Sequence, residues 1–247
     1  MRRLAVLVLL LALPAVAAAT PDSHPCDVAP QFVTPPKPLQ PLKAAIEAGG
    51  PVEILAVGSG ATTGANGLQP DTAYPYRMLD ALRAALPRVT FALTVRGGRG
   101  MTAEEMLPLV KAEVEQTPAK LVLWQTGTVE AIRGLRPARM RQALREGLDI
   151  VHAAGGTLVL LDPQFTRALR ANTDVEPYET EMQQVAALPD AALFHRYDLT
   201  RVWALQGEID PERATKETRE AELERLNVCL GQALARYLLN GADVAAP

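Results

Sequence analysis

Short apolar stretches alternate with amphipathic stretches along this 247-residue chain, and this alternation constrains the fold more than any other feature. The apolar stretches are nearly continuous, whereas the stretches between them carry apolar residues at helical spacing. Buried strands that are separated by helices build a parallel sheet covered on both faces, so we expect an α/β fold. The predicted strands are residues 52–57, 89–95, 121–124, 157–161 and 191–199. The predicted helices are residues 74–86, 137–153, 176–188 and 211–239, with a further helix that begins at a Thr102–Glu105 capping box.

The first nineteen residues have a composition of their own. Arg2 and Arg3 precede an apolar run over residues 4–13, and small alanines follow it. A basic start, a short apolar run and a small-residue exit are typical of a signal peptide, which we place at residues 1–19. The run is shorter than the roughly 20 apolar residues that cross a bilayer. We therefore predict a periplasmic or secreted protein with no membrane span in the mature chain, the alternative being an uncleaved anchor.

Prolines crowd the segment that follows. Seven of them lie between residues 20 and 41. Repeated proline removes backbone donors and fixes an extended path, so we expect an N-terminal arm that is neither helix nor central strand. The regular pattern then runs over residues 42–240, which is long enough for one domain, and residues 241–247 form a tail. The net charge is −3 without a basic stripe, which argues against a nucleic-acid partner.

Only two cysteines are present, Cys26 and Cys229, near opposite ends of the mature chain. In an oxidising compartment an even number of cysteines favours a disulfide, so we predict that these two are bonded. Two free thiols are the alternative. No cluster of histidine, cysteine and carboxylate residues has metal-ligand spacing, and we expect neither a metal nor a cofactor.

Parallel sheets keep their sites at the carboxyl ends of the strands, which directs attention to residues 58–64, 96–100 and 125–130. The glycine-rich first segment is not a phosphate-binding loop, because no Gly-Lys-Ser/Thr closes it. The segment also does not match the fingerprint of a dinucleotide-binding loop. Thr63 stands in place of the third glycine, and Arg96 ends the second strand where an acid is needed.

The strand-end segments ILAVGSGATTG, VRGGRG and LVLWQTGTVEAIRG together resemble the SGNH (GDSL) hydrolases. The resemblance continues through VLLDPQF into the last helix and covers about residues 39–239. It implies a flavodoxin-like three-layer α/β/α sandwich with a central parallel sheet. It also implies an ancestry among enzymes that hydrolyse esters of lipids, acylated sugars and similar acyl groups.

The residues that such hydrolases need are largely missing here. The resemblance implies a nucleophilic serine, an oxyanion site made by a glycine amide and an asparagine, and an Asp-x-x-His pair before the last helix. Gly60 stands at the nucleophile's position, one residue after Ser59, and Val129 replaces the asparagine, whereas Gly97 keeps the glycine.

The Asp-x-x-His pair is also missing. Thr218 and Ala221 fall near its two places, and the three histidines of the chain, His24, His152 and His195, all precede that segment. We interpret His152 as a helix-face residue and His195 as a satisfied strand-end residue, although His195 could act as a base. Asp162 before Pro163 is expected to form a turn or a cap.

We therefore predict a catalytically inactive pseudoenzyme that binds a ligand or partner, such as an acylated or anionic glycan or a protein, at the former cleft. One alternative is an active ester hydrolase that uses Ser59, and another is a structural partner of an active homologue. Arg96 and Arg99 beside open glycine amides at a helix start could hold a small anion, or they could simply be solvated. The candidate ligand-binding residues are Gly58, Ser59, Gly60, Arg96, Gly97, Gly98, Arg99, Gln125, Gly127, Thr128 and Glu130.

Overall fold

A single parallel sheet organises the computed structural model, which describes residues 26–64 and 69–244. The strand order is β2-β1-β3-β4-β5, which is the doubly wound, flavodoxin-like order. The predicted parallel α/β fold is therefore confirmed. The strands are β1 (Val52–Gly58), β2 (Phe91–Gly97), β3 (Leu121–Gln125), β4 (Thr157–Leu161) and β5 (Ala191–Phe194).

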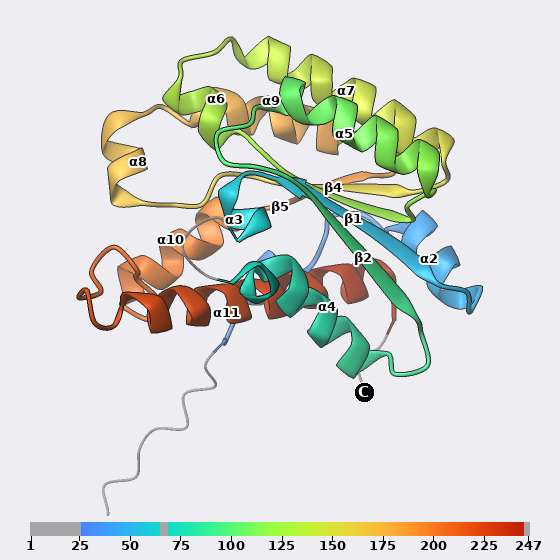
Figure 1. Ribbon diagram of the computed structural model, residues 1–247, viewed down its shortest axis with the longest axis horizontal. Helices are drawn as coiled ribbons and strands as arrows, with labels where there is room; N and C mark the ends of the chain where they lie inside the picture. The colour runs from blue at the N-terminus through green and yellow to red at the C-terminus, as the bar shows by residue number, and fades with distance from the viewer. Residues whose placement is uncertain (1–25, 65–68, 245–247) are drawn as a thin grey trace, which may run out of the picture.

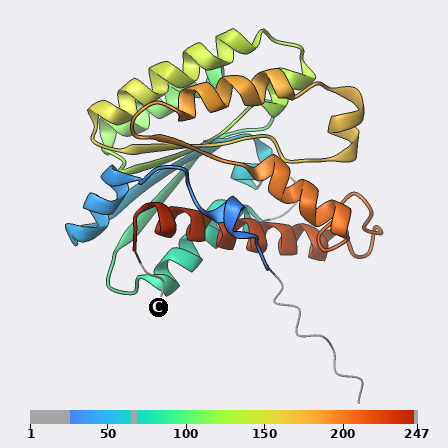
Figure 2. The same cartoon turned by 180° about the vertical axis from the view of Figure 1, so that it is seen from behind.

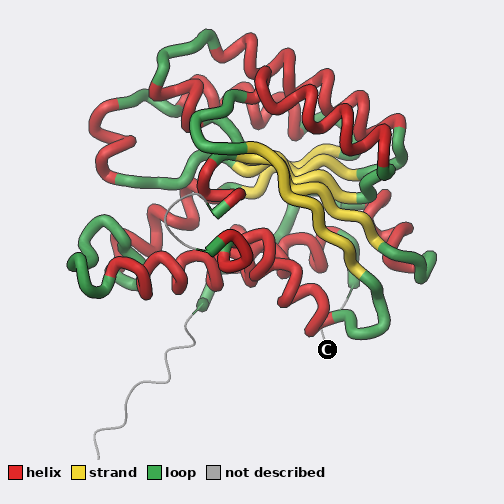
Figure 3. The backbone as a smooth tube through the Cα atoms, viewed as in Figure 1, coloured by secondary structure: helices red, strands yellow, loops and turns green. Residues whose placement is uncertain are grey.

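Helices cover both faces of the sheet (Figures 1 and 2). Helices α5, α7 and α9 lie on one face and α4 and α11 on the other, which gives three layers, and Figure 3 shows the strands between them. The helices are α1 (Pro30–Val33), α2 (Gln40–Glu47), α3 (Gly60–Thr63), the 3-10 turn η1 (Pro70–Thr72), α4 (Tyr74–Ala85), α5 (Ala103–Gln116), α6 (Thr128–Ile132), α7 (Pro137–Ala153), α8 (Arg167–Asn172), α9 (Glu176–Ala186), α10 (Arg196–Gln206) and α11 (Arg219–Gly241).

The continuous apolar strands follow from this layering. In β1, Ile54 and Ala56 belong to the core on the α4 and α11 side, whereas Leu55 and Val57 belong to the core on the α5 and α7 side. Successive side chains of a strand point to opposite faces, so a strand that is buried on both faces needs apolar residues at every position.

The predicted capping box at the start of α5 is confirmed. The Thr102 hydroxyl accepts the N–H of Glu105 at 3.3 Å, and the Glu105 carboxylate accepts the N–H of Thr102 at 2.8 Å. Two backbone donors of the first turn are thereby satisfied, which fixes where the chain turns from strand into helix.

Two predicted strands have other bounds. The second strand runs to Gly97 rather than ending at residue 95, so Arg96 lies within it. The fifth strand ends at Phe194, and residues 196–206 form α10 instead of continuing the strand to residue 199. The reason is a long-range cap: the Asp162 carboxylate accepts the N–H of Tyr197 in the first turn at 2.7 Å.

The prediction of one helix over residues 211–239 is wrong in its first part, because α11 begins at Arg219 and ends at Gly241. The prediction for the proline-rich arm is also wrong in part. Its residues include the one-turn helix α1 and the start of α2, each with proline in the first two positions, where no backbone donor is needed. Val33 and Leu39 of this segment are buried in the core.

A disulfide joins the two ends of the domain. Cys26 is bonded to Cys229 of α11, with their Cα atoms 5.0 Å apart and a sequence separation of 203. The predicted pairing is therefore confirmed. The predicted signal peptide lies outside the described residues. Among the helices of residues 26–64 and 69–244, none has the length and apolar character needed to cross a bilayer.

Candidate functional site

A cavity of about 520 Å³ opens at the carboxyl ends of the strands. Its position agrees with the rule that open parallel sheets bind ligands at this edge. Its volume lies within the usual range for small-molecule sites, roughly 300–1,000 Å³. The lining residues are Ser59, Ala61, Gln125, Thr128, Ile132, Gln164, Thr166, Ala168, Leu169, Asn172, Thr173 and Arg196.

Ser59 and Gln125 form the polar centre of this cavity. Ser59 follows β1 and precedes α3, and Gln125 ends the neighbouring strand β3. The Gln125 Oε1 atom accepts the Ser59 N–H at 3.0 Å and the Ser59 hydroxyl at 2.8 Å. It also accepts the Thr62 hydroxyl at 3.3 Å. Gln125 is 1% exposed, so these three donors hold the amide in one orientation.

The partner of the Ser59 hydroxyl is an amide group and not a base. The Ser59 hydroxyl proton points to an amide oxygen, which accepts a hydrogen bond but does not take up a proton near neutral pH. A serine nucleophile needs a neighbouring base, as imidazole is in the familiar triads. The contact therefore fixes the direction of the Ser59 hydroxyl.

The two histidines within the described residues have partners elsewhere. His152 lies on α7, as predicted, and its Nδ1 is 2.6 Å from the Asp190 carboxylate. His195 precedes α10, and its Nδ1 lies 3.7 Å from the Asp162 carboxylate, which raises the pKa of His195. Asp162 also caps α10, so the predicted capping role of this residue is confirmed.

Glu130 is a structural carboxylate. It is 3% exposed and accepts the N–H of Ala103 at 2.5 Å, the Thr126 hydroxyl at 2.8 Å and the N–H of Gly127 at 3.0 Å. It thereby caps α6 and closes the N-terminus of α5 from a distance. Glu130 is one of the predicted ligand-binding residues, but its oxygens are already occupied by the protein itself.

The expected anion cradle at the start of α5 is not open. The first backbone donors of that helix are taken by Glu130 and by the capping box, and the Gly98 N–H donates to the Gly58 carbonyl at 3.1 Å. Arg96 makes an ion pair with Glu113 of α5 at 2.5 Å. Neither Arg96 nor Arg99 lines the cavity. Of the predicted ligand-binding residues, the cavity brings together Ser59, Gln125 and Thr128.

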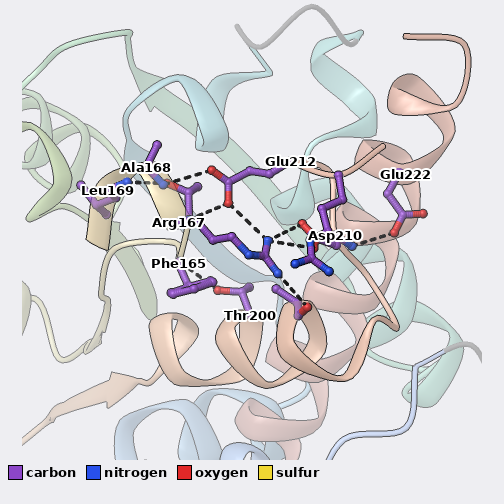
Figure 4. A network of polar contacts seen from close by, with 11 residues as sticks. Phe165, Arg167, Ala168, Leu169, Thr200, Asp210, Glu212 and Glu222 are labelled. Atoms are coloured by element: carbon purple, nitrogen blue, oxygen red, sulfur yellow. Dashed lines mark hydrogen bonds and ion pairs between the residues drawn. The ribbon is translucent and has the colours of Figure 1, made fainter. Parts of the chain in front are cut away.

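Helix α8 supplies a wall that the sequence analysis did not identify. Glu212 accepts the N–H groups of Arg167 and Ala168 at 2.5 and 3.2 Å, and the Arg167 guanidinium lies 2.8 Å from Asp210 (Figure 4). These contacts fasten the segment before α11 to the start of α8.

Arg196 is a further part of the cavity wall that was not among the predicted site residues. It is 1% exposed, begins α10 and contributes to the cavity wall. Its position in the sequence could have identified it, because Arg196 follows the fifth strand and sites in parallel sheets lie at the carboxyl ends of the strands. Gln164 after the fourth strand could have been found in the same way.

Glu179 of α9 lies close to Asp162 and Asp198, and burial together with these carboxyl groups raises its pKa from 4.5 to about 7. An acid with a raised pKa holds its proton more tightly when folded, so its ionisation lowers stability as the pH rises from about 4.5 to about 7. We expect Glu179→Gln to remove this loss and to gain about 1 kcal/mol over the wild type at pH 8, after allowance for solvent screening.

Urea unfolding at pH 5 and pH 8 checks this prediction. His195 contributes a slope of the same sign, because its pKa is also raised when folded, so the difference between variant and wild type is the relevant quantity. An unchanged difference at the two pH values would contradict it.

A protein-family comparison matches nearly the whole described chain. The model of the non-GDSL lipase-like family matches residues 25–244. No curated protein sequence matches the chain.

Several solved structures are similar to this chain in fold. TesA is 22% identical over 70% of this chain and 95% of its own, with a TM-score of 0.54. The lipase/acylhydrolase from Enterococcus faecalis is 17% identical over 79% of this chain and 98% of its own, with a TM-score of 0.56. A two-domain esterase active on acetylated mannans, CEX, is 13% identical over 85% of this chain but only 55% of its own, with a TM-score of 0.68. At these identities the similarity confirms the predicted SGNH-hydrolase fold.

Proposed function

The chain belongs to the non-GDSL lipase-like family, and from this premise we propose that it binds a ligand in the strand-end cavity without hydrolysing esters. One observation carries the proposal. Ser59 lies on the cavity wall, and its hydroxyl donates a hydrogen bond to the amide oxygen of Gln125 at 2.8 Å rather than to a base. A serine in this state is a hydrogen-bonding group rather than a nucleophile.

The residues at the other expected catalytic positions also support a protein that does not hydrolyse esters. Gly60 occupies the expected nucleophile position, and Val129 occupies the position of the asparagine that donates to the oxyanion. Losing one such donor costs about 3–4 kcal/mol in related chemistry. The two places of the Asp-x-x-His pair fall near Thr218 and Ala221 at the start of α11, and neither residue carries a carboxylate or an imidazole.

We also propose that the protein is exported to the periplasm or the cell exterior. The Cys26–Cys229 disulfide supports this location, because disulfides persist in oxidising compartments and are rare in the cytosol. The basic and apolar N-terminus supports it independently.

An ester hydrolase that uses Ser59 is the second candidate. It is favoured by one observation, which is that Ser59 lines a cavity of substrate size at the edge where the fold places its sites. This candidate requires a base that reaches Ser59 in place of Gln125.

We expect purified protein to hydrolyse p-nitrophenyl acetate and butyrate no faster than its Ser59→Ala variant. A fluorophosphonate probe gives the sharper measurement, because an activated serine displaces its fluoride and gains the mass of the phosphonyl group. The chain has only two serines, Ser23 and Ser59, so intact-mass and peptide analysis assigns any adduct without ambiguity. We expect no adduct at Ser59.

The matched control is Gln125→His, which places an imidazole beside the same hydroxyl. Saturable turnover by the wild type that is lost in Ser59→Ala, together with an adduct at Ser59, would establish the hydrolase in place of the binding protein.

A further inference from the structure

The buried guanidinium of Arg196 is not fully satisfied by the protein. Its Nε atom donates to the main-chain carbonyl of Asp162 at 3.0 Å. Its Nη1 atom is buried and has no hydrogen-bond partner among the described residues. Buried donors in native proteins almost always have partners, and an unmet charged donor is among the costliest to leave. Arg196 is one of the residues that line the cavity, so a ligand bound there is a source of the acceptor that the described chain does not supply.

The nearby carboxylate does not fill this role. Asp162 is 2% exposed and lies close enough to Arg196 to interact with its charge. Its two side-chain oxygens face other groups, however, one accepting the N–H of Tyr197 and the other lying 3.7 Å from His195. Arg196 thus lacks the two-pronged contact with a carboxylate that its planar group makes best.

Another part of the cavity wall is apolar. Ala61, Ile132, Ala168 and Leu169 give the cavity an apolar portion. Ile132, at the end of α6, is 63% exposed and is one of two large aliphatic residues of the described chain that are so exposed, the other being Leu205 at 64%. Exposed aliphatic surface on a cavity wall is expected to be covered by an apolar part of a ligand.

We propose that the cavity binds a small monocarboxylate with a short aliphatic chain. The carboxylate accepts hydrogen bonds from Arg196, and the chain packs against Ile132 and Leu169. This inference rests on the proposed binding function and adds the chemical class of the ligand. It also moves the expected anion site from Arg96 and Arg99 to the arginine that lines the cavity.

Calorimetric titration with hexanoate and with hexanamide, its neutral analogue of similar shape, tests the carboxylate. We expect hexanoate to bind at least tenfold more tightly than hexanamide. In Arg196→Met this ratio should fall to about one, because the charged partner is gone. Arg83→Met is the control. Arg83 also donates to a main-chain carbonyl, that of Phe91, but Phe91 begins β2 and so lies at the end of the strand away from the cavity.

A second pair of variants does not depend on a buried substitution and keeps the test decisive if Arg196→Met fails to fold. Ile132→Asp should weaken hexanoate binding at least tenfold, through the lost apolar contact and the added negative charge. Leu205→Asp changes an equally exposed residue outside the cavity and should bind as the wild type does.

Equal affinities for hexanoate and hexanamide in the wild type would overturn the carboxylate proposal while leaving a ligand cavity in place. Absence of binding by either compound would overturn it as well. Failure of the proposed function itself would appear separately, as Ser59-dependent ester turnover and a phosphonyl adduct, so the two failures are distinguishable.

Discussion

Replacing both members of the Cys26–Cys229 disulfide by alanine is expected to lower the free energy of unfolding by up to about 5 kcal/mol. The bond closes a loop of 203 residues, almost the whole domain, and a loop of this size gives the largest chain-entropy term. That loss is comparable to the entire stability of a small domain, which is about 5–15 kcal/mol. Urea unfolding at constant pH measures it.

Packing around Cys229 has to be separated from the effect of the bond, because this residue is fully buried on α11. The control is the wild-type protein unfolded in the presence of a reductant, which removes the crosslink and keeps both sulfur atoms. We expect reduced wild type and the double variant to differ by only about 1 kcal/mol, as for the small volume change from cysteine to alanine. If the reduced and oxidised wild types unfolded at the same urea concentration, the predicted stabilisation would be refuted.

The strand pattern explains why the fold could be predicted from the sequence. Residues such as Leu55 and Ala56 face opposite layers yet are both buried, and only a sheet covered on both sides requires this. Helix and strand boundaries that are fixed by residues far away in the sequence could not be predicted. The first turn of α10 is fixed by Asp162, which lies more than thirty residues earlier, so residues 195–199 looked like a continuing strand.

The candidate site was predictable only where local pattern and topology coincide. Ser59 directly follows one apolar strand and Gln125 ends the next one in the sheet, so the rule that sites lie at the carboxyl ends of the strands brings them together, as the 2.8 Å contact shows. Burial of Arg196 gave no sequence signal, because arginine is mostly exposed and its partner is a main-chain carbonyl. The anchoring of α8 by Glu212 and Asp210 depends on contacts more than forty residues apart, which a charged, helix-like segment does not reveal.

The close approach of β1 and β2 at the site leads to the last prediction, that Gly97→Ala destabilises the protein by more than about 4 kcal/mol. Gly97 has a φ of +113°, and a Cβ atom placed there would lie 2.0 Å from the carbonyl oxygen of Gly58. That carbonyl is fixed by the Gly98 N–H at 3.1 Å, and Ser59 follows it directly, so relief of the clash has to move the serine.

Two further substitutions separate the causes of this loss. Gly49→Ala has a positive φ of +71° but no atom within 4 Å, so it should show the backbone strain alone, about 1 kcal/mol. Gly98→Ala, whose added Cβ meets only the Met101 sulfur at 3.7 Å, should be nearly neutral and controls for a change beside the site. Urea unfolding ranks the three variants. A loss for Gly97→Ala no larger than that for Gly49→Ala would show that the strand ends can separate at little cost. The tight Gly58–Gly97 approach would then not be what holds Ser59 against Gln125.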